Sequence, residues 1–311
     1  MRIVFMGTPL AAVPTLRQCL TDGHEVVAVW TQPDRPSGRG HRVSFSPVKE
    51  FAVAHGLPVY QPARIKNDEA LQIFASHDAD VAVVVAYGRI LPEQFLQTPR
   101  RGCINVHFSL LPLYRGAAPA NWAIVNGETK TGVTTMFIEP TLDTGPILLQ
   151  RETEIGANET APELMERLSV IGAELLGETL SRLDDLTPRP QRDQDATFAP
   201  ILKKEDGLID WTLSAIEIDR CIRGFQPWPN AYTSLKGKGL TIWSAESVPS
   251  VSSVSEVKPG EVLTARRDDL IVNCGEQTAL RLIEVQPEAR KRMGVREFIS
   301  GARMKVGDRF G

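Results

Sequence analysis

The chain has 311 residues, a formal net charge of −3, 42% hydrophobic residues and 23% charged residues. This composition is ordinary for a globular protein, and the length exceeds what one hydrophobic core usually serves, so we expect two domains. No apolar run approaches the roughly 20 residues that cross a bilayer. The opening MRIVFMGTP enters a strand without a signal-peptide pattern. We therefore expect a cytoplasmic protein with no membrane partner.

Residues 1–188 alternate between short apolar runs and longer amphipathic segments. The runs are RIVFM, EVVAVWT, PVYQ, VAVVVA, CINVH and VTTMFIE, and segments such as 47–55 and 68–76 are long enough for crossover helices. Alternation of this kind predicts an α/β domain with a doubly wound, Rossmann-like sheet. The first turn, GTPLAAVP, lacks the glycines of a dinucleotide-binding loop, which makes a nicotinamide-dependent oxidoreductase a poor alternative.

Three polar residues fall where a doubly wound sheet places its ligands, at the carboxyl ends of strands. Asn105 and His107 are two apart in CINVH, so they should project from one face of a strand, and Asp143 follows the next strand in LDTG. An amide donor, an imidazole and a carboxylate suit formyl or acyl transfer to an amine. Taken singly, the histidine could be structural and Asp143 could be a turn former.

Beyond residue 188 the composition changes twice. Residues 189–205 are polar and punctuated by proline, which predicts a linker. Residues 206–311 carry short strand-like runs, AYTSL, LTIWSA, GEVLTA, LIVNC and ALRLIEV, which predict a small β-barrel. The four cysteines show no metal-binding spacing, so we expect free thiols and no metal.

Several motifs together resemble the folate-dependent formyltransferase family. They are N-x-H at 105–107, SLLP at 109–112, YRG at 114–116 and LDTG at 142–145. TQPDRPSGRG at 31–40, SPVK at 46–49, IDW at 209–211 and CIRGFQPWP at 221–229 are similar to the methionyl-tRNA branch of that family. The chain departs from the family pattern at Phe108, where a small residue is usual, and at Leu113 and Tyr114, where Arg and Trp are common.

The resemblance implies transfer of a formyl group from 10-formyltetrahydrofolate to the α-amino group of initiator methionyl-tRNA, by a monomer without metal. It implies an OB-like, tRNA-binding C-terminal domain at 206–311 after the linker at 189–205. The implied catalytic residues are Asn105, His107 and Asp143. The implied folate-binding residues are Ser109, Leu110, Leu111, Pro112, Tyr87, Ile90 and Leu91. The implied tRNA-binding residues are Arg35, Arg39, Arg42, Lys203 and Lys204.

Related activities remain open at this point. A glycinamide ribonucleotide or amino-sugar formyltransferase would keep the same three polar residues, and a formyltetrahydrofolate hydrolase would release formate without an amine. A tRNA-binding protein without activity would not need all three. The loop at 34–49 argues for a nucleic acid acceptor, because it carries arginines on a flexible, proline-interrupted segment. A basic cluster can also be no more than a solvated face.

Overall fold

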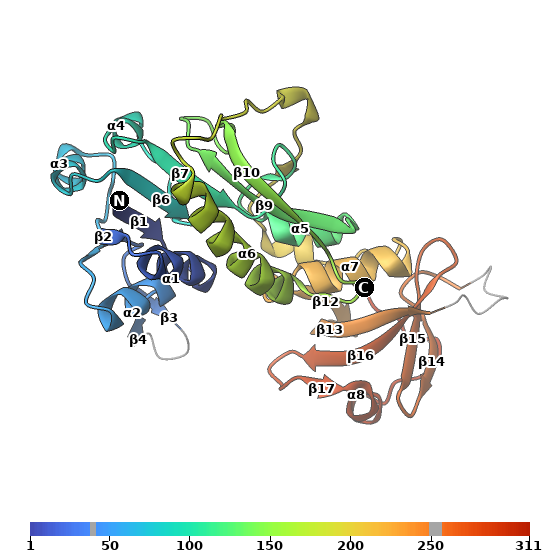
Figure 1. The fold of residues 1–311 in the computed structure, drawn as a ribbon. Helices are drawn as coiled ribbons and strands as arrows, with labels where there is room; N and C mark the ends of the chain where they lie inside the picture. Colours follow the sequence, from blue (N-terminus) through green and yellow to red (C-terminus); the bar gives the residue numbers. More distant parts are fainter. Residues whose placement is uncertain (38–41, 249–256) are drawn as a thin grey trace. The chain divides into compact units, whose positions relative to one another are not determined.

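The computed structural model describes residues 1–37, 42–248 and 257–311 (Figure 1). The chain forms two compact units. The first comprises Met1–Pro119, Lys130–Glu154 and Met165–Ala199, and the second comprises Ala120–Thr129, Ile155–Leu164 and Pro200–Gly311. In the described parts of the chain, no helix is both long and apolar enough to cross a membrane.

A mixed sheet forms the centre of the first unit, in the order β10-β9-β7-β6-β1-β2-β5. The parallel strands are β1 (Arg2–Gly7), β2 (Glu25–Trp30), β5 (Val59–Tyr60), β6 (Val81–Val85) and β7 (Cys103–His107). Strand β9 (Lys130–Phe137) runs antiparallel to β7, and β10 (Ile147–Glu154) runs antiparallel to β9. The predicted α/β, doubly wound class is confirmed, and the strands predicted from apolar runs lie where expected.

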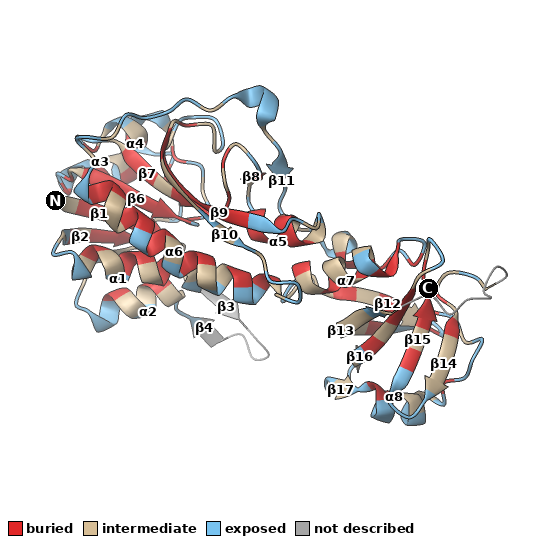
Figure 2. Ribbon diagram, turned by 45° about the vertical axis from the view of Figure 1, so that its right-hand side comes forward, coloured by how far each residue is buried: buried red, intermediate tan, exposed pale blue. Residues whose placement is uncertain are grey.

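Helices cover both faces of this sheet (Figures 1 and 2). On one face, α3 (Asp68–Ser76) and α4 (Glu93–Gln97) bury Phe74 and Phe95 against Trp30, Met6 and Val84. On the other face lie α1 (Val13–Thr21), α2 (Pro47–Ala54) and α6 (Ala161–Ser181) (Figure 1). The short helical turn η1 (Leu10–Ala12) leads into α1. Helix α6 approaches the sheet closely at Gly172, where an added Cβ would lie 2.9 Å from Val106. Burial on both faces explains why the strands are apolar throughout rather than alternating.

The register of β7 determines which way its polar residues face. Asn105 lies opposite Val84 of β6 and Met136 of β9, and His107 lies opposite Thr134. Side chains of directly opposed residues share a face, and residues two apart on a strand do so too. Asn105 and His107 therefore share a face with Met136 and Thr134, opposite to the face that packs on α6. This confirms the orientation expected from their spacing.

Two segments are more regular than their polar composition suggests. The loop after β2 contains an antiparallel hairpin, β3 (Arg35–Ser37) with β4 (Arg42–Ser44). Residues 189–199, expected to belong to the linker, lie in the first unit. The backbone N–H and C=O of Arg189 both pair with Ile147. The short helical turn η2 (Asp193–Asp195) follows, and β11 (Phe198–Ala199) then runs parallel to β8 (Arg115–Gly116). The two compact units therefore differ from the expected division at residues 188 and 205. The assignment of catalysis and tRNA binding to residues 1–188 and 206–311 stays a prediction.

The second unit is built on an antiparallel sheet in the order β12-β13-β16-β15-β14. Its strands are β12 (Ala231–Leu235), β13 (Lys238–Val248), β14 (Val262–Arg266), β15 (Asp269–Asn273) and β16 (Ala279–Pro287), with β17 (Met293–Gly294) pairing with β16. The C-terminal residues join the two edges, because Phe310 bridges to Leu235 and Arg309 bridges to Glu261. This closure confirms the predicted small barrel, since it pairs edge strands that would otherwise stay open.

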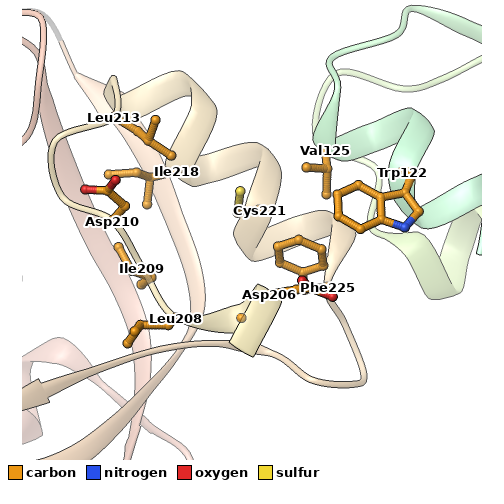
Figure 3. A pocket seen from close by; sticks show the side chains of 11 residues that line it. Trp122, Val125, Asp206, Leu208, Ile209, Asp210, Leu213, Ile218, Cys221 and Phe225 are labelled. Atoms are coloured by element: carbon orange, nitrogen blue, oxygen red, sulfur yellow. The ribbon is translucent and has the colours of Figure 1, made fainter. Parts of the chain in front are cut away.

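Helices α5 (Pro119–Val125), α7 (Ala215–Gly224) and α8 (Val295–Ala302) and the turn η3 (Lys204–Gly207) complete the second unit. Ser214 caps α7 and Glu217 caps it in return, which satisfies two otherwise unpaired backbone amides. Trp122 and Val125 of α5, with Cys221 and Phe225 of α7, line an apolar pocket of about 230 Å³ (Figure 3). None of the predicted catalytic residues lines this pocket.

Candidate active site

His107 is fixed by a backbone carbonyl. Its side chain is only 6% exposed, and Nε2 lies 3.0 Å from the carbonyl oxygen of Tyr114. A carbonyl only accepts hydrogen bonds, so Nε2 carries a proton and donates it there. The other ring nitrogen, Nδ1, is consequently the one that remains available for chemistry.

Asp143 faces that second nitrogen. Its Oδ2 lies 3.8 Å from His107 Nδ1 and accepts a hydrogen bond of 2.8 Å from the backbone N–H of Gly116. The 3.8 Å separation is too long for a hydrogen bond but suits an ion pair when the imidazole is charged. Asp143 has a φ of 52°, a left-handed conformation that aspartate tolerates better than most residues. Gly145 allows the loop to fold back, because a Cβ there would lie 1.8 Å from the Phe137 carbonyl oxygen.

Asn105 lies two residues before His107 and is half-buried. Within the residues that the structure describes, its side-chain amide has no hydrogen-bond partner. Met136 and Ile147, which follow Asn105 across the sheet, form an apolar cluster with Leu111. The amide is thus a free donor beside an apolar surface, where an electrostatic interaction is stronger than in water.

The turn at Ser109–Pro112 is attached to β9 by one threonine. Thr134 Oγ1 donates to the Ser109 carbonyl at 2.7 Å and accepts from the Leu111 backbone N–H at 3.1 Å. Gln150 reinforces the turn, since its amide donates to the Leu111 carbonyl at 2.8 Å and to Thr134 Oγ1 at 3.0 Å. No sequence motif points to either residue, although Thr134 belongs to the run VTTMFIE that predicts β9. The side chain of Ser109 is buried and donates to the Leu113 carbonyl, while Leu110 and Pro112 are partly exposed.

The segment after β6 presents main chain rather than the tyrosine ring. Tyr87 is 2% exposed within the core on the α3 side, and its carbonyl accepts bonds of 3.1 Å from Thr8 and from Gln32. Among described residues its hydroxyl has no partner, and burial raises the pKa of Tyr87 to about 12. Leu91 is buried, whereas Ile90 is 62% exposed. Of the residues predicted here for folate binding, only Ile90 offers an open side chain.

The three departures from the family motifs lie in different environments. Phe108 is buried on the α6 face beside Gly172, away from the face that carries His107. Tyr114 has a φ of 60° and contributes its carbonyl to His107. Leu113 is 40% exposed and contributes its carbonyl to Ser109. The bulky residue at 108 therefore fills the core and leaves the face with His107 unchanged.

The residues predicted to bind tRNA are located only in part. Arg39 lies outside the described residues, and the structure gives the backbone of Arg35 and Arg42, in β3 and β4, but not their side chains. Lys203 and Lys204 are exposed at η3 in the second unit and are followed by Glu205 and Asp206. In the described part of the chain, no group of His, Cys, Asp and Glu side chains could hold a metal ion.

The chain matches two family models. Residues 1–180 match the formyl transferase family, and residues 201–303 match the formyl transferase C-terminal domain. A curated methionyl-tRNA formyltransferase from Caldanaerobacter subterraneus subsp. tengcongensis is 51% identical over 99% of each chain. One from Solibacter usitatus is 49% identical over 100% of this chain and 99% of the relative.

Solved structures show the same fold at low sequence identity. The sugar 3N-formyl transferase WlaRD, solved in the presence of dTDP and 5-N-formyl-THF, superposes with a TM-score of 0.66 over 94% of this chain and 99% of its own, at 18% identity. HypX from Aquifex aeolicus in complex with tetrahydrofolic acid gives a TM-score of 0.64 over 99% of this chain and 48% of its own, at 16% identity. Family models, relatives and fold agree, and the chain belongs to the formyl transferase family, in its methionyl-tRNA formyltransferase branch.

Proposed function

We propose that the protein transfers the formyl group of 10-formyltetrahydrofolate to the α-amino group of methionine on initiator methionyl-tRNA, in the cytoplasm. One observation carries the assignment of the chemistry: Asp143 and Nδ1 of His107 face each other, and the neighbouring amide of Asn105 has no partner among the described residues. The identity of the acceptor is inferred from the methionyl-tRNA formyltransferases that are about half identical to this chain over its full length.

Two donors can stabilise the negative charge that develops on the formyl oxygen when the amine attacks. The Asn105 side-chain amide, which no described residue engages, can donate, and a protonated His107 can donate only from Nδ1, because Nε2 is engaged by Tyr114. Donors held in place before the reaction lower the barrier without reorganising during it. Removing one such donor typically costs about 100- to 1000-fold in turnover.

Asp143 completes the transfer by handling protons. As the new N–C bond forms, the attacking amine loses one proton, and the nitrogen that leaves the formyl carbon gains one. The Asp143 carboxylate would act as the base; it accepts a 2.8 Å hydrogen bond from the Gly116 amide and lies 3.8 Å from His107 Nδ1. Asp143 thereby lies next to the ring nitrogen that would donate to the oxyanion, so the base and the donor act at the same place.

The residues around the site suit a folate as formyl donor. The turn Ser109–Pro112 is fixed by Thr134, with Leu111 in an apolar cluster, and Ile90 is exposed after the neighbouring strand β6. A flat heterocycle binds well to an apolar surface bordered by a few backbone donors and acceptors. Ser109, Leu110, Leu111 and Pro112 would form one wall, and the main chain at Tyr87 with Ile90 and Leu91 the other.

The acceptor tRNA would be held by arginines of the 34–49 loop, Arg35, Arg39 and Arg42, and by Lys203 and Lys204. The second unit adds exposed basic residues at Arg290 and Lys291. With an overall charge of −3, such local groups must provide the attraction to phosphate.

The test is a comparison of acceptors with the purified full chain and radiolabelled 10-formyltetrahydrofolate. We expect label on initiator methionyl-tRNA, much less on elongator methionyl-tRNA and none on free methionine. The His107→Ala variant, prepared in parallel, controls for a contaminating host enzyme. Efficient labelling of an amino sugar or of free methionine, with none on the tRNA, would refute the proposed acceptor.

A further inference from the structure

Gln191 connects the loop of Asp143 to a buried arginine. Its amide nitrogen donates to the carbonyl oxygens of Asp143 at 2.9 Å and Gly145 at 2.7 Å. Its amide oxygen accepts two bonds from Arg115, 3.0 Å from Nε and 2.9 Å from Nη2. Two donors and two acceptor positions are thus all used, which is the full hydrogen-bonding capacity of a glutamine side chain.

The orientation of this amide follows from its partners. A guanidinium can only donate and a carbonyl can only accept, so the oxygen must face Arg115 and the NH₂ group must face the Asp143 loop. Arg115 is only 5% exposed and also pairs with Asp193 at 2.9 Å. A buried, doubly bonded guanidinium has little freedom, so it holds Gln191 in one position.

The same segment also supports the histidine. Thr197 accepts the backbone N–H of Tyr114 on its Oγ1 at 2.9 Å and that of Arg115 on its carbonyl at 2.9 Å. Tyr114 is the residue whose carbonyl holds His107 Nε2. The segment 189–199 therefore holds Asp143 directly, through Gln191, and His107 indirectly, through the bond of Thr197 to Tyr114.

The need for such support is visible at Asp143 itself. A non-glycine residue with a φ of 52° lies in a sparsely populated region of backbone space and persists only where its surroundings hold it. Its carboxylate must still stay beside the Gly116 amide and near Nδ1 of His107. Misplacement of a reacting group by about 1 Å can cost on the order of 100-fold in rate.

We propose that Gln191, in the segment between the two parts of the chain matched by the family models, is the residue that positions Asp143 for the reaction. This rests on the proposed role of Asp143 in formyl transfer. Gln191 touches neither substrate; it acts by fixing the Asp143 backbone. Its removal should lower kcat and leave substrate binding unchanged.

Two substitutions in the full chain separate this role from general stability. Gln191→Glu keeps the oxygens that accept from Arg115 and removes the NH₂ group that holds the Asp143 loop, and Gln191→Ala removes both. We expect kcat to fall at least ~10-fold in each, with KM for both substrates changed less than about 3-fold. Arg192→Ala is the matched control, because Arg192 lies next to Gln191 yet pairs only with Asp195 in this part of the structure.

A double-mutant cycle tests whether Gln191 acts through Asp143. In the Asp143→Asn background, Gln191→Glu should cost less than about 3-fold, because the group that it positions is already lost. An equal loss of kcat in both backgrounds, or a kcat of Gln191→Glu like that of Arg192→Ala, would overturn the proposal.

A second readout does not depend on activity. The Gly116 amide donates to Asp143 Oδ2, so its hydrogen exchange reports whether the carboxylate is in place. Exchange at Gly116 should accelerate in Gln191→Glu and stay unchanged in Arg192→Ala. If the unsubstituted chain transferred no formyl group while Gly116 responded in this way, the proposed function would fail and the positioning role would stand. Unchanged exchange in Gln191→Glu would overturn the positioning role.

Discussion

Nδ1 of His107 lies 3.8 Å from Oδ2 of Asp143, while Nε2 of the same ring is held by the Tyr114 carbonyl at 3.0 Å. The ring can therefore neither turn over nor change its tautomer without losing a buried hydrogen bond. The ring thus keeps Nδ1 free of a hydrogen bond to the described residues, which is what the proposed role of His107 as an oxyanion donor requires.

The first prediction concerns these groups and Asn105. Asn105→Ala, His107→Ala and Asp143→Ala should each lower turnover by at least ~100-fold, because each removes a positioned donor or base. The three act together, so double variants should lose much less than the product of the single losses. Steady-state formyl transfer measures the effect, with circular dichroism to verify folding. A folded Asp143→Ala variant with near-normal turnover would remove Asp143 from the mechanism.

The second prediction concerns Thr134, which holds the Ser109–Pro112 turn of the proposed folate site. Thr134→Val keeps the shape of the side chain and leaves the Leu111 N–H and the Ser109 carbonyl without their partner. Loss of that support should weaken binding of a folate analogue by about 2- to 10-fold, the equivalent of one net hydrogen bond. Titration calorimetry measures the change.

Thr135→Val is the matched control for that experiment. Thr135 is equally buried but points to the opposite face, where it bonds Thr179 at 2.8 Å. It should lower stability by a similar amount without weakening the folate analogue. Equal affinities in the two variants would show that the Ser109–Pro112 turn does not depend on Thr134.

The sequence predicted the parts of the site that follow strand periodicity. Asn105 and His107 could be assigned to one face because side chains alternate along a strand. Gln191 and Thr197 could not be found in this way, because they lie in a polar, irregular segment whose partners are backbone carbonyls and amides far away in sequence. Nor could spacing show that the Tyr87 ring enters the core, since that depends on how the chain turns after β6. The closure of the barrel by Phe310 likewise depends on pairing that no local pattern encodes.

The third prediction is a pH dependence of stability. His77 is buried and accepts a hydrogen bond of 3.2 Å from the Trp30 indole, and burial lowers the pKa of its imidazole below 6.5. The unfolded chain therefore binds more protons in this range, so the free energy of unfolding should be greatest above pH 6.5 and fall as the pH drops through the folded pKa.

His77→Gln, which keeps an acceptor for the indole but cannot titrate, should show a shallower fall. The free energy of unfolding of both proteins is measured in urea between about pH 5 and 8. The test uses the difference between the unsubstituted protein and His77→Gln, because His24, which also has a lowered pKa, is present in both. Identical slopes would mean that His77 is not the group responsible.

The fourth prediction concerns the loop arginines. Replacing Arg35, Arg39 or Arg42 by alanine should weaken tRNA use and leave folate binding intact. Each lost phosphate contact should flatten the salt dependence of tRNA binding by roughly 0.7 to 0.9 log units per log unit of salt. Arg100→Ala is the control of equal charge, since Arg100 is 61% exposed and paired with Asp78. A salt slope unchanged from that of the control would remove the loop from tRNA binding.

The most direct measurement is the identity of the amino acid recovered from initiator tRNA after incubation with the full chain and 10-formyltetrahydrofolate. Mild alkaline release followed by mass spectrometry should give N-formylmethionine with the unsubstituted protein, and methionine with His107→Ala. Recovery of unmodified methionine together with free formate, using folded protein and intact charged tRNA, would contradict formyl transfer and point to hydrolysis of the folate instead.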